Sequence, residues 1–501
     1  MTEATLPQTV PASESPPEPD PRRWIALAVI AIAQLMVVLD ATIVNIALPR
    51  AQEALSISDA DRQWVVTAYT LAFGGLLLLG GRIADFAGRR RTFIIGLLGF
   101  AAASAIGGAA VNSGMLFGAR VVQGAFAALL APASLSLLAV TFTSVKERST
   151  AFAVYGAIAS GGSAVGLLLG GVLTEYTSWR WCLLVNIPIA IIAVIGALAV
   201  VRESRAPGDT RYDIPGAVLV TLGLASLVYG FTQAADQTIG WTSVRSLGFI
   251  LAGLVLLTAF VVVESRTRHA LLPLRILLDR DRGGSYLTSM LVGAGLFAMF
   301  LFLSYYFQLV LHYSPIRSGL AFLPFSVALV LTAGFVSRVL PRTGPKPLMA
   351  VGALAAADGL LSLLRIDLDT SWATTVLPAE VVMGVGLGLL FVPLSSTALV
   401  GIGSHDAGVA SATLNATQQI GGSLGTALLN TFAASAVTGY LADRAGSASQ
   451  PLVQLQAQVY SFHVAFAWGA GLLGLGFVAV MVLIRAGRHT DAVPDAGVAA
   501  V

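Results

Sequence analysis

The chain has 501 residues, of which 56% are hydrophobic and only 11% are charged. Soluble domains carry about 25% charged residues, so this composition excludes a soluble globular protein and indicates an integral membrane protein. The formal net charge is +3. The basic residues stand singly or in short clusters between apolar runs, which excludes a nucleic-acid-binding surface.

Both ends of the chain lack the pattern of a membrane-spanning segment. Residues 1–21 contain six prolines, four acids and no basic residue. This composition cannot form a packed core and lacks the positive region of a signal peptide, so we interpret it as a disordered tail. Residues 489–501 are interpreted as a second tail.

Fourteen apolar runs lie between the tails, each long enough to cross about 30 Å of hydrocarbon at about 1.5 Å per residue. Their approximate cores are 24–48, 63–82, 92–111, 115–140, 150–173, 180–201, 214–234, 245–264, 284–309, 317–338, 347–365, 373–398, 408–435 and 462–484. An even number of crossings puts both termini on one side. Of the 29 Lys and Arg residues, 21 share that side, seven lie opposite and one is inside a helix. The positive-inside rule therefore predicts a multi-pass protein of the cell membrane with both termini in the cytoplasm.

The sequence also contains an internal repeat. The matching pairs are "ARVVQGAFAALL" (119–130) with "AEVVMGVGLGLL" (379–390), "GGS" at 161–163 with "GGS" at 421–423, and "GRIADFAGRRR" (81–91) with "SRVLPRTGPKP" (337–347). The offset is 260 residues for the first two pairs and 256 for the third. Their order and near-constant offset favour duplication over chance.

The duplication predicts two bundles of six helices each, at residues 22–203 and 273–488, with an inserted helix pair at 204–272. An even number of crossings separates the copies, so they are parallel repeats related by an axis along the membrane normal. Substrate sites in transporters built this way lie between the bundles, near the middle of the membrane.

Four ordered motifs carry a resemblance to a known family. They are "LDATIVNIALP" (39–49), "GRIADFAGRRR" (81–91), "RVVQGAFAALLAP" (120–132) and "SWRWCLLVNIP" (178–188). Over about residues 22–488 the chain resembles the fourteen-helix drug:proton antiporter group of the major facilitator superfamily. The resemblance implies an all-α major facilitator fold with fourteen transmembrane helices. It also implies export of drugs, antibiotics or lipophilic metabolites by alternating access.

The resemblance further implies a proton gradient as the energy source, with no cofactor, no metal and no enzyme activity. The expected partners are a small lipophilic substrate, protons and the lipid bilayer, with no nucleic acid, and we expect a monomer. A proton-coupled importer and a dedicated metabolite exporter of the same fold remain alternatives.

An ATP-driven pump is excluded within this chain, because Lys146 and Lys346 do not end a phosphate-binding loop. A membrane-embedded enzyme is a remote alternative, because the five histidines are spread singly through the chain.

One motif departs from the family. "GSAVGLLLGG" (162–171) resembles the antiporter motif but has Leu167 where that motif has proline. A helix without the proline keeps a hydrogen bond and straightens, which weakens the argument for export from this motif. The glycines can also serve close helix packing alone.

The resemblance implies that the loop motif is a conformational latch. Its residues would be Gly81, Asp85, Gly88, Arg89 and Arg90, with the acid bound to a neighbouring helix N-terminus or arginine in one conformation only. The alternative is that the arginines merely determine the topology.

A carboxylate, Asp40, interrupts the first apolar run. It lies roughly 24 Å along a helix that starts near Trp24 on the cytoplasmic side, which places it in the outer half of a membrane core about 30 Å thick. Arg120 and Glu380 lie about 8 and 10 Å below the outer boundary, at roughly the same depth as Asp40. Ionisable groups at this depth are costly, so we predict that the three form a proton-coupling and substrate site. The alternative is a static structural ion pair.

Further polar and aromatic side chains are candidates for lining the cavity, with ordinary interhelical contacts as the alternative. They are Thr42, Asn45, Gln123, Tyr305, Tyr306, Gln308, Asn415 and Gln418.

Overall fold

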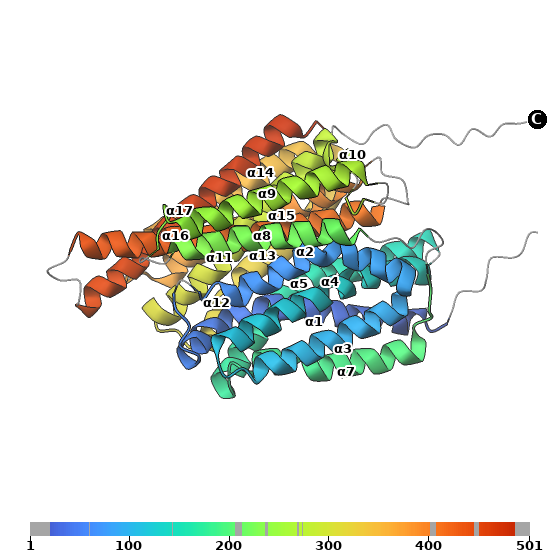
Figure 1. Cartoon of the computed structure of the whole chain (residues 1–501), viewed down its shortest axis with the longest axis horizontal. Coiled ribbons are helices and arrows are strands. Elements are labelled where there is room, and N and C mark those ends of the chain that lie inside the picture. Colours follow the sequence, from blue (N-terminus) through green and yellow to red (C-terminus); the bar gives the residue numbers. More distant parts are fainter. Residues whose placement is uncertain are drawn as a thin grey trace, which may run out of the picture.

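The computed structural model describes residues 21–59, 61–142, 144–205, 213–235, 239–267, 270–272, 274–400, 407–444 and 450–485. The predicted tails, 1–21 and 489–501, lie outside the described residues except for Pro21. The described segments are helices joined by short connections, with no strand among them (Figure 1).

The first part of the chain forms one group of helices, which we call the N-terminal half. It comprises α1 (Arg23–Ala54), α2 (Trp64–Ala87), α3 (Arg89–Gly108), α4 (Ser113–Thr141), α5 (Val145–Tyr176), the short α6 (Trp181–Leu184) and α7 (Asn186–Val200). The sixth predicted crossing is therefore divided between α6 and α7. In Figure 1 this half is drawn in blue to teal.

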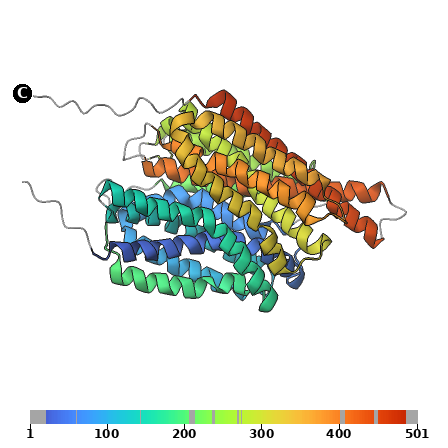
Figure 2. The same cartoon turned by 180° about the vertical axis from the view of Figure 1, so that it is seen from behind.

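The last part forms the C-terminal half. It comprises α10 (Leu274–Leu277), α11 (Arg280–Tyr305) with the π-helical η1 (Tyr306–Val310), α12 (Pro315–Ala321), α13 (Leu323–Thr343), α14 (Pro345–Ser362) with η2 (Leu363–Arg365), the π-helical η3 (Trp372–Val376) with α15 (Leu377–Leu399), α16 (Ala407–Ala442) and α17 (Pro451–Leu483). Figure 2 shows the two halves from behind, side by side with their long helices running in similar directions.

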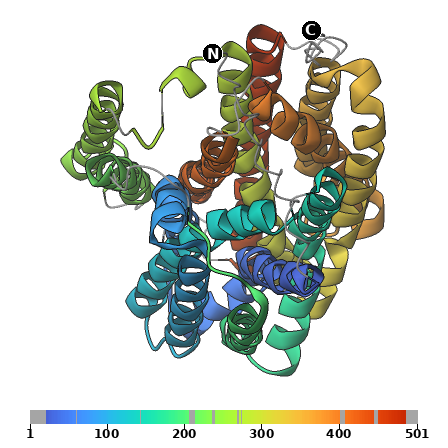
Figure 3. The same ribbon diagram turned by 90° about the vertical axis from the view of Figure 1, so that its right-hand side faces the viewer.

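Between the halves in sequence lie α8 (Ile214–Ala235) and α9 (Val244–Arg266), the inserted pair. α8 packs on α2 of one half and on α16 of the other, and α9 packs on α8. Figure 3, an end-on view, shows this pair in green at the side of the two bundles.

Thirteen described helical segments are long and apolar enough to cross a membrane. α5, with 32 residues, packs along α1 and is the fourteenth long helix. α1 begins and α17 ends at the same end of the molecule, which we call the terminal face (Figure 1). We call the other end the opposite face. The chain is thus an all-helical, multi-pass membrane protein.

The helix crossings repeat at the offsets found in the sequence. A Cβ on Gly124 of α4 would lie 2.3 Å from the carbonyl oxygen of Tyr69 on α2, and one on Gly384 of α15 would lie 2.4 Å from that of Phe325 on α13. The two glycines, Gly124 and Gly384, are 260 residues apart in sequence. The residues that they contact, Tyr69 and Phe325, are 256 residues apart. Only glycine allows these backbones to approach so closely. The two halves are therefore parallel repeats with the same internal packing.

The glycine motif of α5 is a packing surface on two sides. Gly166 lies against Thr42 of α1, and a Cβ on Gly171 would lie 2.6 Å from the backbone of Ile316 in α12. In return, a Cβ on Gly319 of α12 would lie 2.4 Å from the carbonyl oxygen of Leu167. Close packing, including a tight crossing between the two halves, accounts for the glycines of this segment without the proline.

Two helices are longer than predicted. α17 begins at Pro451 rather than 462, and α16 continues to Ala442 rather than 435, so that this pair projects at the opposite face (Figure 1). The hydropathy pattern misses the first turns of α17 because Gln454, Gln456 and Gln458 interrupt it. Contact between the rings of Tyr440 and Tyr460, with centroids 5.4 Å apart, helps to hold the pair together.

Candidate functional site

The first apolar helix holds its carboxylate inside a polar cluster. Asp40 of α1 and Arg120 of α4 are 0% and 1% exposed, and Arg120 Nη1 donates to Asp40 Oδ2 over 2.6 Å. The other carboxylate oxygen, Oδ1, accepts from Gln123 Nε2 at 3.1 Å and from Asn186 Nδ2 at 2.8 Å. A charge-assisted pair with these additional donors satisfies a carboxylate that has no access to water.

The rest of the cluster orients the amides and the guanidinium. Ser104 of α3 accepts from both Gln123, at 2.7 Å, and Asn186, at 3.3 Å. Arg120 Nε donates to the carbonyl oxygen of Val65 over 2.9 Å, and its guanidinium carbon lies 4.4 Å from the centre of the Tyr69 ring. We call these residues, together with Asp40, the Asp40 cluster.

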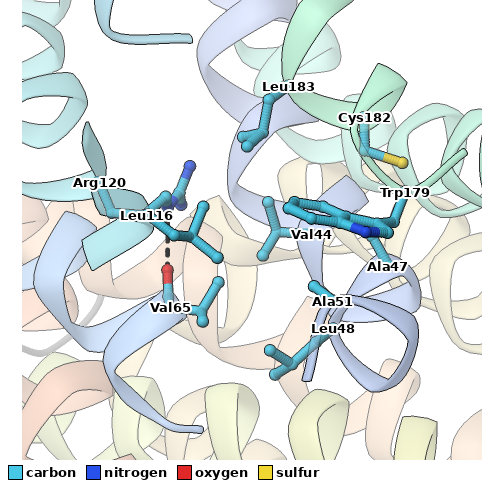
Figure 4. Close-up of a pocket in the computed structure, with 10 residues that line it drawn as sticks. All are labelled: Val44, Ala47, Leu48, Ala51, Val65, Leu116, Arg120, Trp179, Cys182 and Leu183. Carbon is cyan, nitrogen blue, oxygen red and sulfur yellow. Dashed lines mark hydrogen bonds between the residues drawn. The ribbon is translucent and has the colours of Figure 1, made fainter. Parts of the chain in front are cut away.

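The surroundings of the Asp40 cluster are apolar. Figure 4 shows Arg120 beside a small cavity whose other lining side chains are apolar or weakly polar, among them Leu116, Trp179 and Cys182. In this conformation the carboxylate is sealed inside the N-terminal half, away from any aqueous space. Gln123 is therefore part of the cluster and does not line an open cavity, contrary to the sequence-based prediction.

Asn186 and Ser104 are functional candidates that the sequence analysis missed. Asn186 is the only amide in the motif "SWRWCLLVNIP", and both side chains are 0% exposed. A buried amide in an apolar helix needs a polar partner, so this residue could have been identified from its position alone.

Glu380 is not brought to the Asp40 cluster. It lies on α15 in the C-terminal half, is 1% exposed, and neither carboxylate oxygen has a hydrogen-bond partner. One turn along the same helix, Gly384 packs on Phe325 of α13. The expectation of three ionisable groups at one site is wrong in this structure, because equal depth in two different bundles does not place side chains together.

The predicted latch residues lie at the terminal face. Arg89 Nη2 and Asp85 Oδ1 form an ion pair of 2.9 Å, one helical turn apart across the α2–α3 corner. Gly88 has φ of +115°, a conformation that side-chain-bearing residues rarely adopt, so glycine is required there. Gly81 packs against Pro132 of α4 at an ordinary distance of 3.5 Å.

A different acid binds the N-terminus of α3. Glu203 accepts from the backbone N–H groups of Arg90 and Arg91, both at 3.1 Å, and Arg90 Nη2 donates to the carbonyl oxygen of Leu198 over 2.8 Å. The sequence analysis offered Asp85 for the role of helix-terminus acid and did not identify Glu203, which is 113 residues away from Arg90 in sequence. All these contacts are within the N-terminal half.

The two halves are bonded to each other near the opposite face. Arg62, only 4% exposed, donates to Asn430 Oδ1 of α16 over 3.2 Å and lies 4.3 Å above the ring of Tyr305 on α11. Its Nη1 is 3.5 Å from Asp59 Oδ1, and the Tyr305 hydroxyl donates to Gln52. We call these five residues the closure cluster; the sequence analysis found only Tyr305.

Deeper contacts between the halves involve α1 directly. Ser304 Oγ donates to the carbonyl oxygen of Asn45 over 2.7 Å, and Gln308 Nε2 donates to that of Ile46 over 3.0 Å. The Thr70 and Ser423 hydroxyls lie 2.5 Å apart across the α2–α16 contact. Gln308 thus lies at the interface between the halves.

The remaining candidates have different environments. Thr42 and Asn45 bond to the backbone of their own helix, and Tyr306, 0% exposed, donates to the carbonyl oxygen of Asp367 over 2.7 Å. Tyr305, at the interface between the halves, and Tyr306, inside the C-terminal half, are both buried and do not line an open cavity in this conformation. Asn415 is exposed and Gln418 half-buried on α16.

The described residues contain no group of three or more His, Cys, Asp or Glu side chains that could hold a metal ion.

The model of the Major Facilitator Superfamily matches residues 30–426. The puromycin resistance protein of Streptomyces alboniger is 48% identical over 486 residues, covering 96% of this chain and 95% of that protein. The cephamycin export protein of Amycolatopsis lactamdurans is 39% identical, covering 84% of this chain and 87% of that protein.

Solved structures match across the chain at low identity. The crystal structure of a bacterial homologue of the human lysosomal transporter Spinster, described as inward-facing and unoccupied, aligns with a TM-score of 0.64 at 14% identity, covering 93% of this chain and 98% of that one. At this identity the match establishes the fold alone.

Proposed function

Because this chain belongs to the major facilitator superfamily, we propose that it is a secondary active exporter of antibiotics or similar lipophilic compounds, driven by a proton gradient. The observation that carries the proposal is near-full-length similarity to a puromycin resistance protein. The actinorhodin, lincomycin and tetracenomycin proteins of other Streptomyces species, named for transport, resistance or export, support the same function.

The orientation is part of the proposal. The excess of Lys and Arg at the terminal face supports a cytoplasmic location of that face. The closure cluster then lies on the outer side of the membrane. With Arg62 bonded to Asn430 and packed on Tyr305, the halves are held together on that side, as expected for a conformation that loads substrate from the cytoplasm.

Proton coupling through Asp40 requires movement inside the N-terminal half. All side chains bonded to Asp40 belong to α4 and α7 of that half, so rigid rocking of one half against the other would leave them unchanged. α1, however, is bonded to α11 through the carbonyl oxygens of Asn45 and Ile46, about one to two turns beyond Asp40. Opening the outer side breaks these bonds and frees α1 to shift.

A shift of α1 relative to Arg120 would separate the two members of the buried ion pair. A buried charge without its partner is costly, so we expect this separation to be accompanied by proton binding at the carboxyl group. Asp40 would thus bind and release one proton per cycle, in step with the contacts at the outer side. The static ion pair is the alternative, and it predicts no change of protonation during transport.

The test uses purified protein in proteoliposomes with an imposed pH gradient and puromycin as the first substrate. Puromycin movement against its gradient that collapses when the pH gradient is dissipated supports the proposal. Movement with the proton flux, into the compartment that represents the cytoplasm, identifies an importer instead. Conversion of puromycin by the protein without any gradient would revive an enzyme.

A dedicated exporter of one metabolite is the second candidate, because several relatives are named for a single antibiotic. A susceptibility panel comparing expressing and deleted cells separates the two. Protection against several unrelated compounds supports multidrug export, whereas protection against one supports the dedicated exporter.

A further inference from the structure

One hollow lies outside every site discussed so far. It encloses about 490 Å³ at the opposite face of the C-terminal half, between the end of α11, the start of α12 and the connection from η2 to η3. Its size falls in the range of small-molecule sites, about 300–1,000 Å³. Tyr313, Arg317, Asp369 and Trp372 are among its lining residues.

The backbone around this hollow is irregular on both sides. η1 (Tyr306–Val310) and η3 (Trp372–Val376) are both π-helical, and His312 between η1 and α12 has a positive φ of 52°. π-Helical turns and strained residues cost free energy and are concentrated at functional sites. Two such turns facing one hollow are therefore an independent indication of a binding site.

The polar groups of the hollow have unused bonding capacity. Trp372 Nε1–H is buried and has no acceptor. Arg317 lies 3.8 Å above the ring of Tyr313, and in the part of the chain that the structure describes it has no ion-pair partner. Asp369 is exposed and also has no ion-pair partner among the described residues. One cation and one carboxylate, together with the Trp372 ring, thus line a single space.

This combination matches a zwitterion with an anionic and a cationic group. Arginine binds phosphate oxygens, and a carboxylate binds an ammonium group. Apolar surface continues next to the polar groups, because Leu309 and Leu320, one turn or less from lining residues, are 42% and 49% exposed. Tryptophan and tyrosine are also enriched where helices meet the headgroup level.

We propose that this hollow binds the headgroup of a zwitterionic phospholipid of the phosphatidylethanolamine type, from the leaflet at the opposite face. The phosphate contacts Arg317, the ammonium group contacts Asp369, and an acyl chain runs over Leu309 and Leu320. Val310 at the end of η1 lines the hollow, and Tyr306 of η1 is hydrogen-bonded to Asp367 beside it. An occupant therefore contacts the segment that follows Tyr305, a member of the closure cluster.

The test is native mass spectrometry of the full-length protein in detergent, titrated with dioleoyl phosphatidylethanolamine or with dioleoyl phosphatidylglycerol. Wild type should retain the ethanolamine lipid in preference. Arg317→Ala should weaken its binding about tenfold, since a charge-assisted contact is lost. Asp369→Asn should abolish the preference over the glycerol lipid while retaining binding.

Two matched controls carry the same chemical changes outside the hollow. Arg365→Ala and Asp443→Asn remove exposed charges near the same face and should leave binding unchanged. Arg317→Gln removes the charge but keeps most of the side-chain volume, so it tests the site even if Arg317→Ala folds poorly. It should weaken binding several-fold.

Two outcomes overturn the proposal. If the three pocket variants bind the ethanolamine lipid as the wild type and controls do, the hollow is not a lipid site. If soluble glycerophosphoethanolamine displaces the lipid at equal concentration, the site recognises a soluble zwitterion and the assignment to a membrane lipid is wrong.

Discussion

The centres of the two halves are built on the same helix crossings but from opposite chemistry. The offset of 260 residues places Glu380 where the N-terminal half has Arg120, and Met383 where it has Gln123. On α11, the counterpart of α1, Phe300 is buried. Phe300 packs against Phe322 and Phe325, each with ring centroids 5.4 Å away. The crossings constrain the glycines, whereas the residues between them have been free to diverge.

The comparison also explains why Glu380 has no partner. In the N-terminal half the guanidinium of Arg120 faces an acid and an amide, but in the C-terminal half the position equivalent to Gln123 carries the thioether of Met383. Burying a carboxyl group without hydrogen-bond donors lowers the stability of the fold, so a structural role does not account for Glu380. The polar centre of one half thus contributes to stability, and the isolated acid of the other half does not.

The largest effect should come from removing the cation of the polar centre. Arg120→Ala leaves Asp40 buried without its ion-pair partner, so it should lower the free energy of unfolding by about 3–5 kcal/mol and abolish transport. Thermal unfolding in detergent and efflux assays measure both effects. Arg120→Lys, which keeps the charge, should recover part of the stability. If Arg120→Ala melts at the same temperature as the wild type, the polar centre does not contribute to stability, and the two halves do not differ in this respect.

Asp40→Asn separates charge from shape in the same cluster. The amide can still contact Gln123, so insertion and folding should be retained, but the side chain can no longer exchange a proton. Efflux driven by a pH gradient should be lost. The deciding measurement is substrate-induced proton release from solubilised protein at about pH 6 to 9. Unchanged proton release in the variant would identify Asp40 as purely structural.

Glu380→Gln should behave differently from both changes. Since no donor is bonded to Glu380, the substitution should leave the melting temperature equal to or above that of the wild type. If the acid contacts substrate in another conformation, the substrate range should narrow, with cationic compounds losing most. A destabilisation as large as that of Arg120→Ala would mean that Glu380 has a partner and that the halves are alike.

Asp85→Asn tests the corner between the second and third helices, where only the N-terminal half carries an acid. The ion pair with Arg89 is partly exposed, at 15% and 35%, so its loss should cost at most about 1 kcal/mol of stability. Transport should nevertheless be slower if the contact forms in one conformation only. Rates in proteoliposomes equal to those of the wild type would leave the arginines with a topological role alone.

The smallest expected effect is at the terminal face. Arg23 and Glu147 form a 2.8 Å ion pair between the first turns of α1 and α5, and the hydrogen bond from Arg23 lowers the pKa of the Glu147 carboxyl from its usual 4.5. A lowered folded-state pKa stabilises the folded protein above about pH 4.5 and is lost as pH falls below it. Melting temperatures of wild type and Glu147→Gln should therefore converge at low pH. A difference that grows with acidity would contradict the pairing.

The sequence determined the membrane class, the helical architecture, the repeat and the family, because each depends on patterns that are local or recur at a constant offset. Apolar runs of about 20 residues can be satisfied in lipid only as helices. The offset of 260 residues placed Gly124 and Gly384 in equivalent crossings before any coordinates were considered. The hydropathy pattern placed the start of α17 too late in the sequence, because glutamines interrupt the first turns of that helix.

Tertiary structure decided which of the polar residues meet. Equal depth pointed equally to Arg120 and Glu380 as neighbours of Asp40, but depth gives no information on rotation about a helix axis or on which bundle a side chain faces. The packing of α1 against α4 and α7 brings Arg120, Gln123 and Asn186 to Asp40 and leaves Glu380 alone. Long-range contacts of this kind, like that of Arg62 with Asn430 across 368 residues, arise from the arrangement of whole helices, which no local pattern specifies.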